Sequence, residues 1–291
     1  MHRRRALGYK LDKEGLLLLS FARYADRSGH QGPVSNKLVI RWASLPRDAA
    51  SAYWARRLNT VRVFARYQAV IEPATQIPQR HVFGSANRRK TPHIFAAKEL
   101  RRLLRCARQL SSGLRALTYQ TLIGLLACTG LRISEALNLT VRDVDLEQGL
   151  LRVGQSKFQH SRLVPLHPSA NRRLRHYARC RSREFPQAQH FFVSGRGLAL
   201  GYFTACRVFR KLACDLPPSN GRPHVRLHDL RHTFACRVLV NWQRSSRGAS
   251  GRVAILSRYL GHTHLRDTYW YLTAVPHLLQ QAAKHFAPPS P

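Results

Sequence analysis

The residues whose chemistry stands out lie in the C-terminal third of the chain. They are two imidazoles, one guanidinium and two phenols: His228, His262, Arg231, Tyr269 and Tyr271. Imidazole and guanidinium groups stabilise negative charge on a phosphate, and a phenol can act as a nucleophile. This set suits a displacement at a phosphate diester in which a tyrosine attacks.

A second set lies nearer the middle of the chain. Arg132 follows a Gly turn and opens a predicted helix, and helix N-termini attract anions, so we expect a phosphate-binding corner there. Glu135, one turn further on, is expected to orient a guanidinium. Lys157 lies at the tip of a predicted hairpin, where a lysine can reach a phosphate and donate a proton. For Arg132 and Lys157, a side chain that only covers surface or is solvated is the alternative.

The apolar pattern predicts the frame that must position these groups. Helical spacing indicates helices, and short β-rich runs indicate strands. The helices are expected at residues 97–104, 117–126, 254–260 and 271–285, and the strands at 150–153, 162–166 and 191–193, with a loop at 242–251. The expected fold class is mainly α with a small β-sheet (α+β).

The N-terminal part has a different character. Residues 1–75 read as a small helical bundle, residues 76–92 as a basic linker, and residues 93–291 as a second domain. Basic residues lie between the apolar positions of the bundle and also occur in the linker. The candidate DNA contacts among them are Arg56, Arg57, Arg62, Arg66, Arg88, Arg89 and Lys90. A solvated helix surface and a plain tether are the alternatives.

The charge balance points to a polyanionic partner. The 291 residues carry 49 Lys+Arg against 14 Asp+Glu, a formal net charge of +35 at pH 7, while the apolar fraction of 44% is that of a globular protein. Because the charge is spread along apolar-patterned segments, nucleic acid is the expected partner. A basic ribosomal or packaging protein is the alternative. A membrane role is not expected, since no signal peptide or long apolar span is evident.

Cysteine and acid usage narrow the chemistry further. The six cysteines are scattered without a Cys-x-x-Cys pair, which favours buried free thiols in a reducing cytoplasm over a zinc site. Two-metal catalysis needs clustered carboxylates. The close acidic group, Asp143, Asp145 and Glu147, reads instead as a helix end and a turn before the first strand. We therefore expect no metal and no cofactor.

Several motifs together resemble those of the tyrosine recombinases, also called the phage integrase family. Residues 129–135 (TGLRISE) match the first arginine motif, residues 228–232 (HDLRH) the second, and residues 260–262 (LGH) the third. Lys157 falls at the position of the family's hairpin lysine. The family's nucleophile follows the third motif's histidine by nine residues, which selects Tyr271 over Tyr269.

The resemblance covers nearly the whole chain and implies a fold and an activity. It implies a helical (SAM-like) core-binding domain, a linker and a catalytic domain. The nucleophile, Tyr271, would form a 3′-phosphotyrosyl link to DNA. The groups implied to bind the phosphate or move protons are Arg132, Lys157, His228, Arg231 and His262. Four protomers on two duplexes would exchange strands in the bacterial cytoplasm, and the participation of related recombinases as partners is left open.

Two other functions fit the same residues. A type IB topoisomerase-like enzyme would use the same chemistry without exchanging partners, and a non-catalytic DNA-binding protein would keep only the basic surface. The sequence departs from the family pattern in lacking an obvious N-terminal arm-site domain and in a longer Ser/Gly-rich segment at residues 242–251. The DNA site and the outcome, whether integration, excision or transposition, are not specified by these residues.

Overall fold

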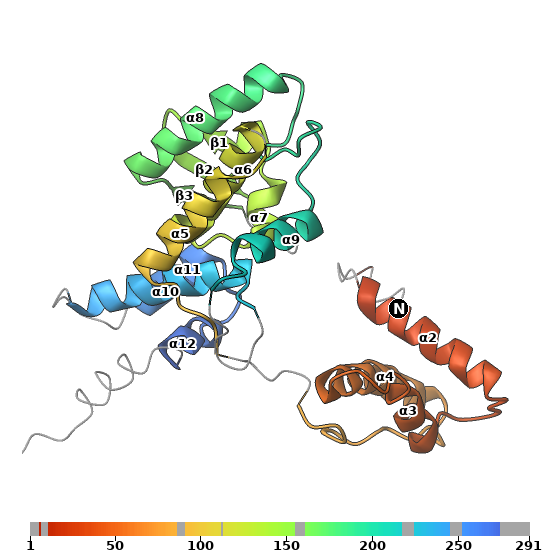
Figure 1. The fold of residues 1–291 in the computed structure, drawn as a ribbon. Helices are drawn as coiled ribbons and strands as arrows, with labels where there is room; N and C mark the ends of the chain where they lie inside the picture. Colours follow the sequence, from red (N-terminus) through yellow and green to blue (C-terminus); the bar gives the residue numbers. More distant parts are fainter. Residues whose placement is uncertain are drawn as a thin grey trace, which may run out of the picture. The chain divides into compact units, whose positions relative to one another are not determined.

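The computed structural model describes residue 6 and residues 11–85, 91–111, 113–154, 161–216, 224–244 and 252–273. The chain divides into two compact units, residues 1–89 and 90–291 (Figure 1). The assignment of a DNA-gripping domain, a linker and a catalytic domain to residues 1–75, 76–92 and 93–291 stays a prediction.

Residues 11–85 of the first unit form the helices α2 (Asp12–Arg27), α3 (Asn36–Ala43) and α4 (Ser51–Ile71). Ser35 accepts a hydrogen bond from the Leu38 N–H (3.3 Å) and so caps α3, as its position predicts. The helices enclose a core that includes Phe21, Trp42 and Val61. Residues that follow α4 pack back on this unit, because the Gln76 N–H donates to the Val34 carbonyl and the Phe83 ring contacts Trp54.

The second unit is organised around one buried helix, α6 (Gly113–Thr129). The helices that pack on it most extensively are α5 (Ala97–Arg108), α8 (Pro168–Glu184) and α10 (Leu227–Arg244). Its apolar residues point in several directions, which is typical of a helix buried on most sides. The remaining helices are α7 (Ile133–Asn138), the 3-10 turn η1 (Val141–Asp143), α9 (Tyr202–Leu212), α11 (Arg252–Leu260) and α12 (Arg266–Thr273).

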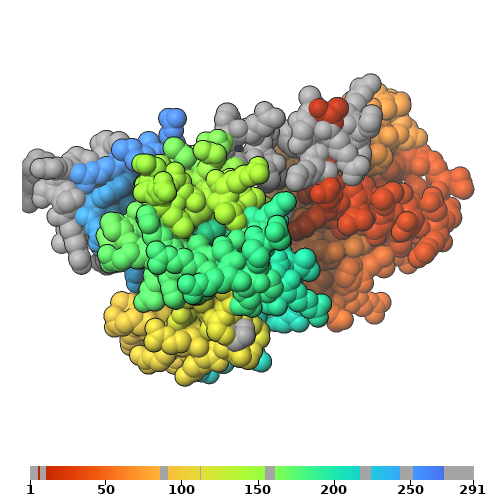
Figure 2. All heavy atoms as spheres, turned by 90° about the horizontal axis from the view of Figure 1, so that it is seen from above, coloured from red at the N-terminus to blue at the C-terminus, as the bar shows by residue number. Residues whose placement is uncertain are grey.

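A small antiparallel sheet completes the second unit. Its strands β1 (Val144–Asp145), β2 (Leu150–Val153) and β3 (Arg162–Pro165) lie in that order, with Leu151 opposite Val164 and Val153 opposite Arg162. Figure 2 shows the segment around the strands, yellow-green, and α8, green, on one surface of this unit. The predicted fold class, mainly α with a small sheet, is confirmed.

The prediction of a third strand at residues 191–193 is wrong. These residues lie outside the sheet, and Phe191 and Phe192 pack on the Tyr177 ring of α8 with centroid distances of 5.4 Å each. The Val193 N–H donates to the Tyr177 hydroxyl (3.2 Å). A short apolar run in the sequence is compatible with a strand or with a buried segment that is not part of a sheet. Here the run packs against a helix.

Three other expectations need correction. Residues 242–244 of the predicted loop (242–251) belong to α10 instead, and residues 245–251 lie outside the described part. The last predicted helix, 271–285, begins earlier, since α12 starts at Arg266; residues beyond 273 lie outside the described part. All six cysteines are free thiols, but only Cys236 is buried, whereas Cys128 and Cys214 are exposed.

Within the described residues, no helix has the length and apolar character needed to cross a membrane.

Candidate active site

The first arginine of the site is held at a helix junction. Gly130 follows α6 with a positive φ of 65°, and Arg132 then occupies the N-cap position of α7. The Arg132 guanidinium donates to Glu135 Oε1 (2.7 Å) and to the Gly261 carbonyl (2.8 Å). Its side chain is 36% exposed. A guanidinium carries five N–H donors, more than these two bonds use, so Arg132 retains capacity for a bound oxyanion.

The second arginine is buried. Arg231 lies on α10 with 1% of its surface exposed. Its Nη1 donates to the Gly130 carbonyl (2.7 Å) and its Nη2 to the Leu260 carbonyl (2.6 Å). Burial lowers the pKa of Arg231, while the nearby phenol of Tyr271 opposes that shift. Fixed carbonyl partners on two different helix ends therefore set the orientation of this cation before any ligand arrives.

A capped helix start fixes the position of Arg231 and its neighbour His228. Asp229, fully buried, accepts from the Arg226 N–H (2.8 Å) and from the Arg226 guanidinium (3.0 Å). Thr233 on the next turn donates to the Asp229 carbonyl (2.8 Å) and accepts from the Phe95 N–H (2.9 Å). These bonds tie the first turn of α10 to the segment that precedes α5.

The third motif places an imidazole beside a phenol. His262 Nε2 lies 3.5 Å from the Tyr271 hydroxyl, and the two rings are stacked at 5.8 Å. On its other side, His262 Nδ1 lies 2.7 Å from the hydroxyl of Thr268, which is fully buried. When Nδ1 donates to Thr268, Nε2 is the acceptor that faces Tyr271.

The two tyrosines differ sharply in environment. Tyr271 is 2% exposed and lies against the His232 ring (5.2 Å between centroids), whereas Tyr269 is 52% exposed. Burial raises the pKa of Tyr271, and the charge and hydrogen bond of Arg231 oppose that rise. Of the two candidates, only Tyr271 reaches the cations and imidazoles.

The pKa values of two site imidazoles, His262 and His228, are lowered. Burial, followed by the positive charges of Arg231 and Arg132, lowers the pKa of His262 to about 4. Desolvation, followed by the positive charges of Arg231 and Arg226, also lowers the pKa of His228, which keeps part of its surface accessible to solvent. A lowered pKa favours the neutral imidazole, which is the form that can accept a proton.

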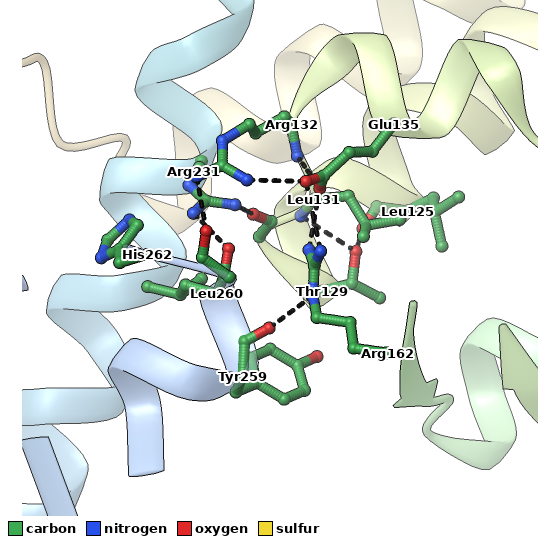
Figure 3. Close-up of polar contacts among 12 residues, drawn as sticks. Leu125, Thr129, Leu131, Arg132, Glu135, Arg162, Arg231, Tyr259, Leu260 and His262 are labelled. Atoms are coloured by element: carbon green, nitrogen blue, oxygen red, sulfur yellow. Dashed lines mark hydrogen bonds and ion pairs between the residues drawn. The ribbon is translucent and has the colours of Figure 1, made fainter. Parts of the chain in front are cut away.

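The structure thus brings together five of the six predicted catalytic residues: Arg132, His228, Arg231, His262 and Tyr271. The sixth, Lys157, lies outside the described residues. The prediction that Glu135 orients a guanidinium is confirmed, since it bonds Arg132. Figure 3 shows that it also holds Arg162, a residue that the sequence pattern placed only in a strand.

The acidic group near the sheet has structural partners. Asp143 Oδ2 accepts from the Thr140 N–H (2.9 Å) and hydroxyl (2.6 Å), and Asp145 Oδ1 accepts from the Glu147 and Gln148 N–H groups (3.0 and 2.8 Å). These contacts confirm the interpretation as a helix end and a turn. Among the residues that the structure describes, no three His, Cys, Asp or Glu side chains gather as a metal-binding group.

The candidate DNA contacts of the first unit do not all share one environment. Arg56 and Arg66 are exposed, and the half-buried Arg62 donates to the Pro78 carbonyl (2.7 Å). Arg57 is 7% exposed, donates to the Trp42 carbonyl (2.8 Å) and covers the Trp42 ring at 3.9 Å. We therefore leave Arg57 out of the DNA contacts. The linker residues Arg88, Arg89 and Lys90 lie outside the described part.

Comparison with known proteins identifies the class. Residues 94–277 match the model of the phage integrase family. The chain is 37% identical to a putative integrase/recombinase, y4rB, of Sinorhizobium fredii, over 97% of this chain and 92% of that protein. It is 28% identical to the tyrosine recombinase XerD of Bradyrhizobium diazoefficiens, over 93% and 88%. The chain belongs to the phage integrase family, the tyrosine-type site-specific recombinases.

Solved structures agree on the fold. The Tn1549 transposon integrase in complex with transposon right end DNA superposes with a TM-score of 0.68 at 16% identity, covering 93% of this chain and 92% of that one. A lambda integrase dimer bound to a core site gives 0.64 at 17% identity, covering 93% and 92%.

Proposed function

We propose that this recombinase cuts and rejoins DNA through a covalent link between Tyr271 and a 3′-phosphate, in the bacterial cytoplasm, for the movement of a genetic element. The observation that supports this most is the position of the Tyr271 phenol. It is buried beside His262 and close to Arg231, while the phenol two residues earlier faces solvent.

The proposed reaction is a balanced displacement. The Tyr271 oxygen forms a bond to the scissile phosphorus, and the bond from phosphorus to the 5′-oxygen breaks. The phenolic proton passes to a neutral imidazole, for which His262 Nε2 is placed at 3.5 Å and His228 is the second candidate. Lys157 protonates the departing 5′-oxygen. Because the phosphotyrosyl ester keeps the energy of the broken ester, a new 5′-hydroxyl can reverse the reaction without ATP.

The arginines act on charge in this scheme. Arg132 and Arg231 would bind the non-bridging phosphate oxygens, and both are oriented by protein carbonyls before DNA arrives. Donors that are fixed in advance stabilise the transition state without reorganisation. Two guanidinium forks and the imidazoles supply this stabilisation from the chain's own side chains.

DNA contacts outside the catalytic centre would come from the basic surface. The exposed Arg56 and Arg66 and the half-buried Arg62 support a phosphate-binding role for α4, and Arg88, Arg89 and Lys90 remain proposed contacts. One structural relative is a lambda integrase tetramer bound to a Holliday junction. By this likeness we propose that four protomers assemble on two duplexes, with related recombinases as alternative partners.

A suicide DNA substrate tests the nucleophile. The wild-type protein should form a covalent adduct on a nicked site from its own element, and Tyr271→Phe should bind the DNA but form none. Tyr269→Phe is the matched control, because it removes the exposed phenol of the same helix and should form adduct normally. Adduct in Tyr271→Phe, mapped by mass spectrometry to another residue, would remove this assignment.

Assays of the wild-type protein also distinguish the two alternative functions. Binding without any adduct in the wild-type protein would favour a non-catalytic DNA-binding protein. Relaxation of any supercoiled plasmid by a monomer, without a paired specific site, would favour a type IB topoisomerase-like enzyme.

A further inference from the structure

The side chain of Arg162 points from the sheet toward the site. Along β3, Arg162 and Val164 share one face, and Val164 is fully buried, whereas Leu163 between them is 59% exposed. Arg162 pairs with the buried Val153 of β2, so it occupies the core face of the hairpin. A charged side chain on a core face needs polar partners.

Arg162 has such partners on two other elements. Its guanidinium binds Glu135 in a fork, with Nη2 at 2.8 Å from Oε2 and Nη1 at 3.2 Å from Oε1. Its Nε donates to the Tyr259 carbonyl (2.8 Å), 97 residues away in sequence. The Arg162 side chain is 14% exposed and that of Glu135 is 7% exposed. One residue therefore joins β3, α7 and α11.

Glu135 links Arg162 to the site arginine. The same carboxylate accepts from Arg132 Nη1 (2.7 Å) and from the Arg132 N–H (2.9 Å). Burial alone would raise the pKa of Glu135, but the hydrogen bond and charge of Arg162, followed by the hydrogen bonds of Arg132, hold it below its ordinary value. The carboxylate is thus a fixed anion shared by two guanidinium groups.

The end of α11 receives three guanidinium groups in succession. The carbonyls of residues 259, 260 and 261 accept from Arg162, Arg231 and Arg132, respectively (Figure 3). The last carbonyls of a helix lack partners within the helix and carry partial negative charge, so cations there are stabilising. The next residue in the chain is His262. The three arginines hold the turn from which this imidazole projects.

We propose that Arg162 is a positioning residue for DNA cleavage, which acts through Glu135 and the Tyr259 carbonyl to fix the Arg132 guanidinium and the turn that carries His262. This inference rests on the proposed function. It assigns no contact between Arg162 and the DNA. An arginine suits this place because its fork binds two carboxylate oxygens while Nε reaches a third acceptor, whereas an ammonium group is a point charge without this planar geometry.

Single-turnover adduct formation on pre-bound DNA, measured beside DNA affinity, tests the proposal. Arg162→Met should slow adduct formation about 100-fold, the order of loss that a misplaced catalytic group produces, with affinity nearly unchanged. Arg162→Lys, which keeps the charge but only part of the fork, should lie between the two. Arg152→Met is the matched control: Arg152 is exposed on the opposite face of the neighbouring strand, so its loss should leave the adduct rate near wild type.

A double-mutant cycle distinguishes positioning from general destabilisation. If Arg162 acts through Glu135, then Arg162→Met combined with Glu135→Gln should cost far less than the product of the two single losses. An adduct rate near wild type in Arg162→Met, losses that multiply, or a loss that follows DNA affinity would each overturn the inference. Absence of adduct in the wild-type protein would instead overturn the proposed function, and this inference with it.

Discussion

At the scale of single residues, the site is a set of cations whose directions are fixed by backbone carbonyls. Arg132 and Arg231 bond to the same turn from different elements, but they differ in burial: Arg231 is 1% exposed, and the side chain of Arg132 is 36% exposed. The same substitution at the two positions should therefore separate chemistry from stability.

Arg132→Lys and Arg231→Lys make this comparison. Both should slow adduct formation on pre-bound DNA by roughly 100-fold or more, because a point charge cannot supply the forked contact to the phosphate. Arg231→Lys should also lower the free energy of unfolding by about 3 kcal/mol, since buried carbonyls of Gly130 and Leu260 lose their donor. Chemical denaturation followed by circular dichroism measures the second effect. Equal losses of stability in the two variants would contradict the difference in burial.

Acid should destabilise the free protein through His262. Its pKa is about 4 in the folded protein against an ordinary value of 6.5, so the unfolded chain takes up the proton first as the pH falls. The stabilising contribution is present above about pH 6.5 and is lost as the pH falls toward 4. The ionisable groups around this ring are Arg231, Arg132, Asp267 and His228.

Denaturation of the DNA-free protein across this pH range provides the measurement. The free energy of unfolding should decline less steeply in His262→Gln than in the wild type, because glutamine does not titrate. Parallel declines in the two proteins would show that His262 is not the group responsible.

At the scale of elements, the site depends on the helix ends that meet there. α6 ends at Gly130, α7 begins after Arg132, and α11 ends just before Gly261. Helix ends leave backbone groups without partners inside the helix. Here the carbonyl of Gly130 and those at the end of α11 bond to arginines instead, so the same contacts complete the helices and orient the catalytic groups.

Gly130→Ala tests the junction between α6 and α7. A Cβ at this position would lie 2.4 Å from Phe234 Cδ1, and the backbone has a φ of +65°. Strain and overpacking together should cost about 2–4 kcal/mol of the free energy of unfolding, with slower adduct formation, since the Gly130 carbonyl orients Arg231.

Gly124→Ala is the matched control, with an expected change of opposite sign. Gly124 lies inside α6, and an added Cβ there meets no atom within 4 Å. Alanine should raise the free energy of unfolding by about 0.5–1 kcal/mol. A Gly130→Ala variant as stable as Gly124→Ala would show that α6 can end without a glycine.

At the scale of the whole molecule, the excess of positive charge dominates. A formal net charge of +35 on 291 residues favours association with a polyanion, and the affinity should fall steeply with salt. Not every positive charge is available to bind DNA, because Arg57 is buried in the first unit and covers the Trp42 ring.

Salt titrations of DNA binding should separate the two kinds of arginine. Arg66→Gln, at an exposed position, should reduce the slope of log affinity against log salt by about 1 and leave stability unchanged. Arg57→Gln should leave the slope unchanged and lower the free energy of unfolding by about 3 kcal/mol, because the Trp42 carbonyl loses a charged donor and the ring loses its cation. If Arg57→Gln instead reduced the salt slope and left stability unchanged, Arg57 would again be a candidate DNA contact.

What the sequence determined by itself was local. The one-turn spacing of His228 and Arg231, the glycine before Arg132 and the reach of Glu135 back to Arg132 all follow from helix geometry over a few residues. Local patterns alone could not choose between Tyr269 and Tyr271. Side chains two residues apart on a helix face different directions, and only the packing shows which one is buried.

The tertiary structure decided which distant groups meet. Arg231 bonds to a carbonyl 101 residues away, and Arg162 bonds to one 97 residues away. The residue pattern predicted that Arg162 lies in a strand, but not that its side chain enters a polar cluster. The pattern also predicted a strand at residues 191–193, which instead pack into the core outside the sheet. Local patterns fix which face of an element is apolar; the partner on that face is selected by the packing of the whole unit, which no short stretch of sequence contains.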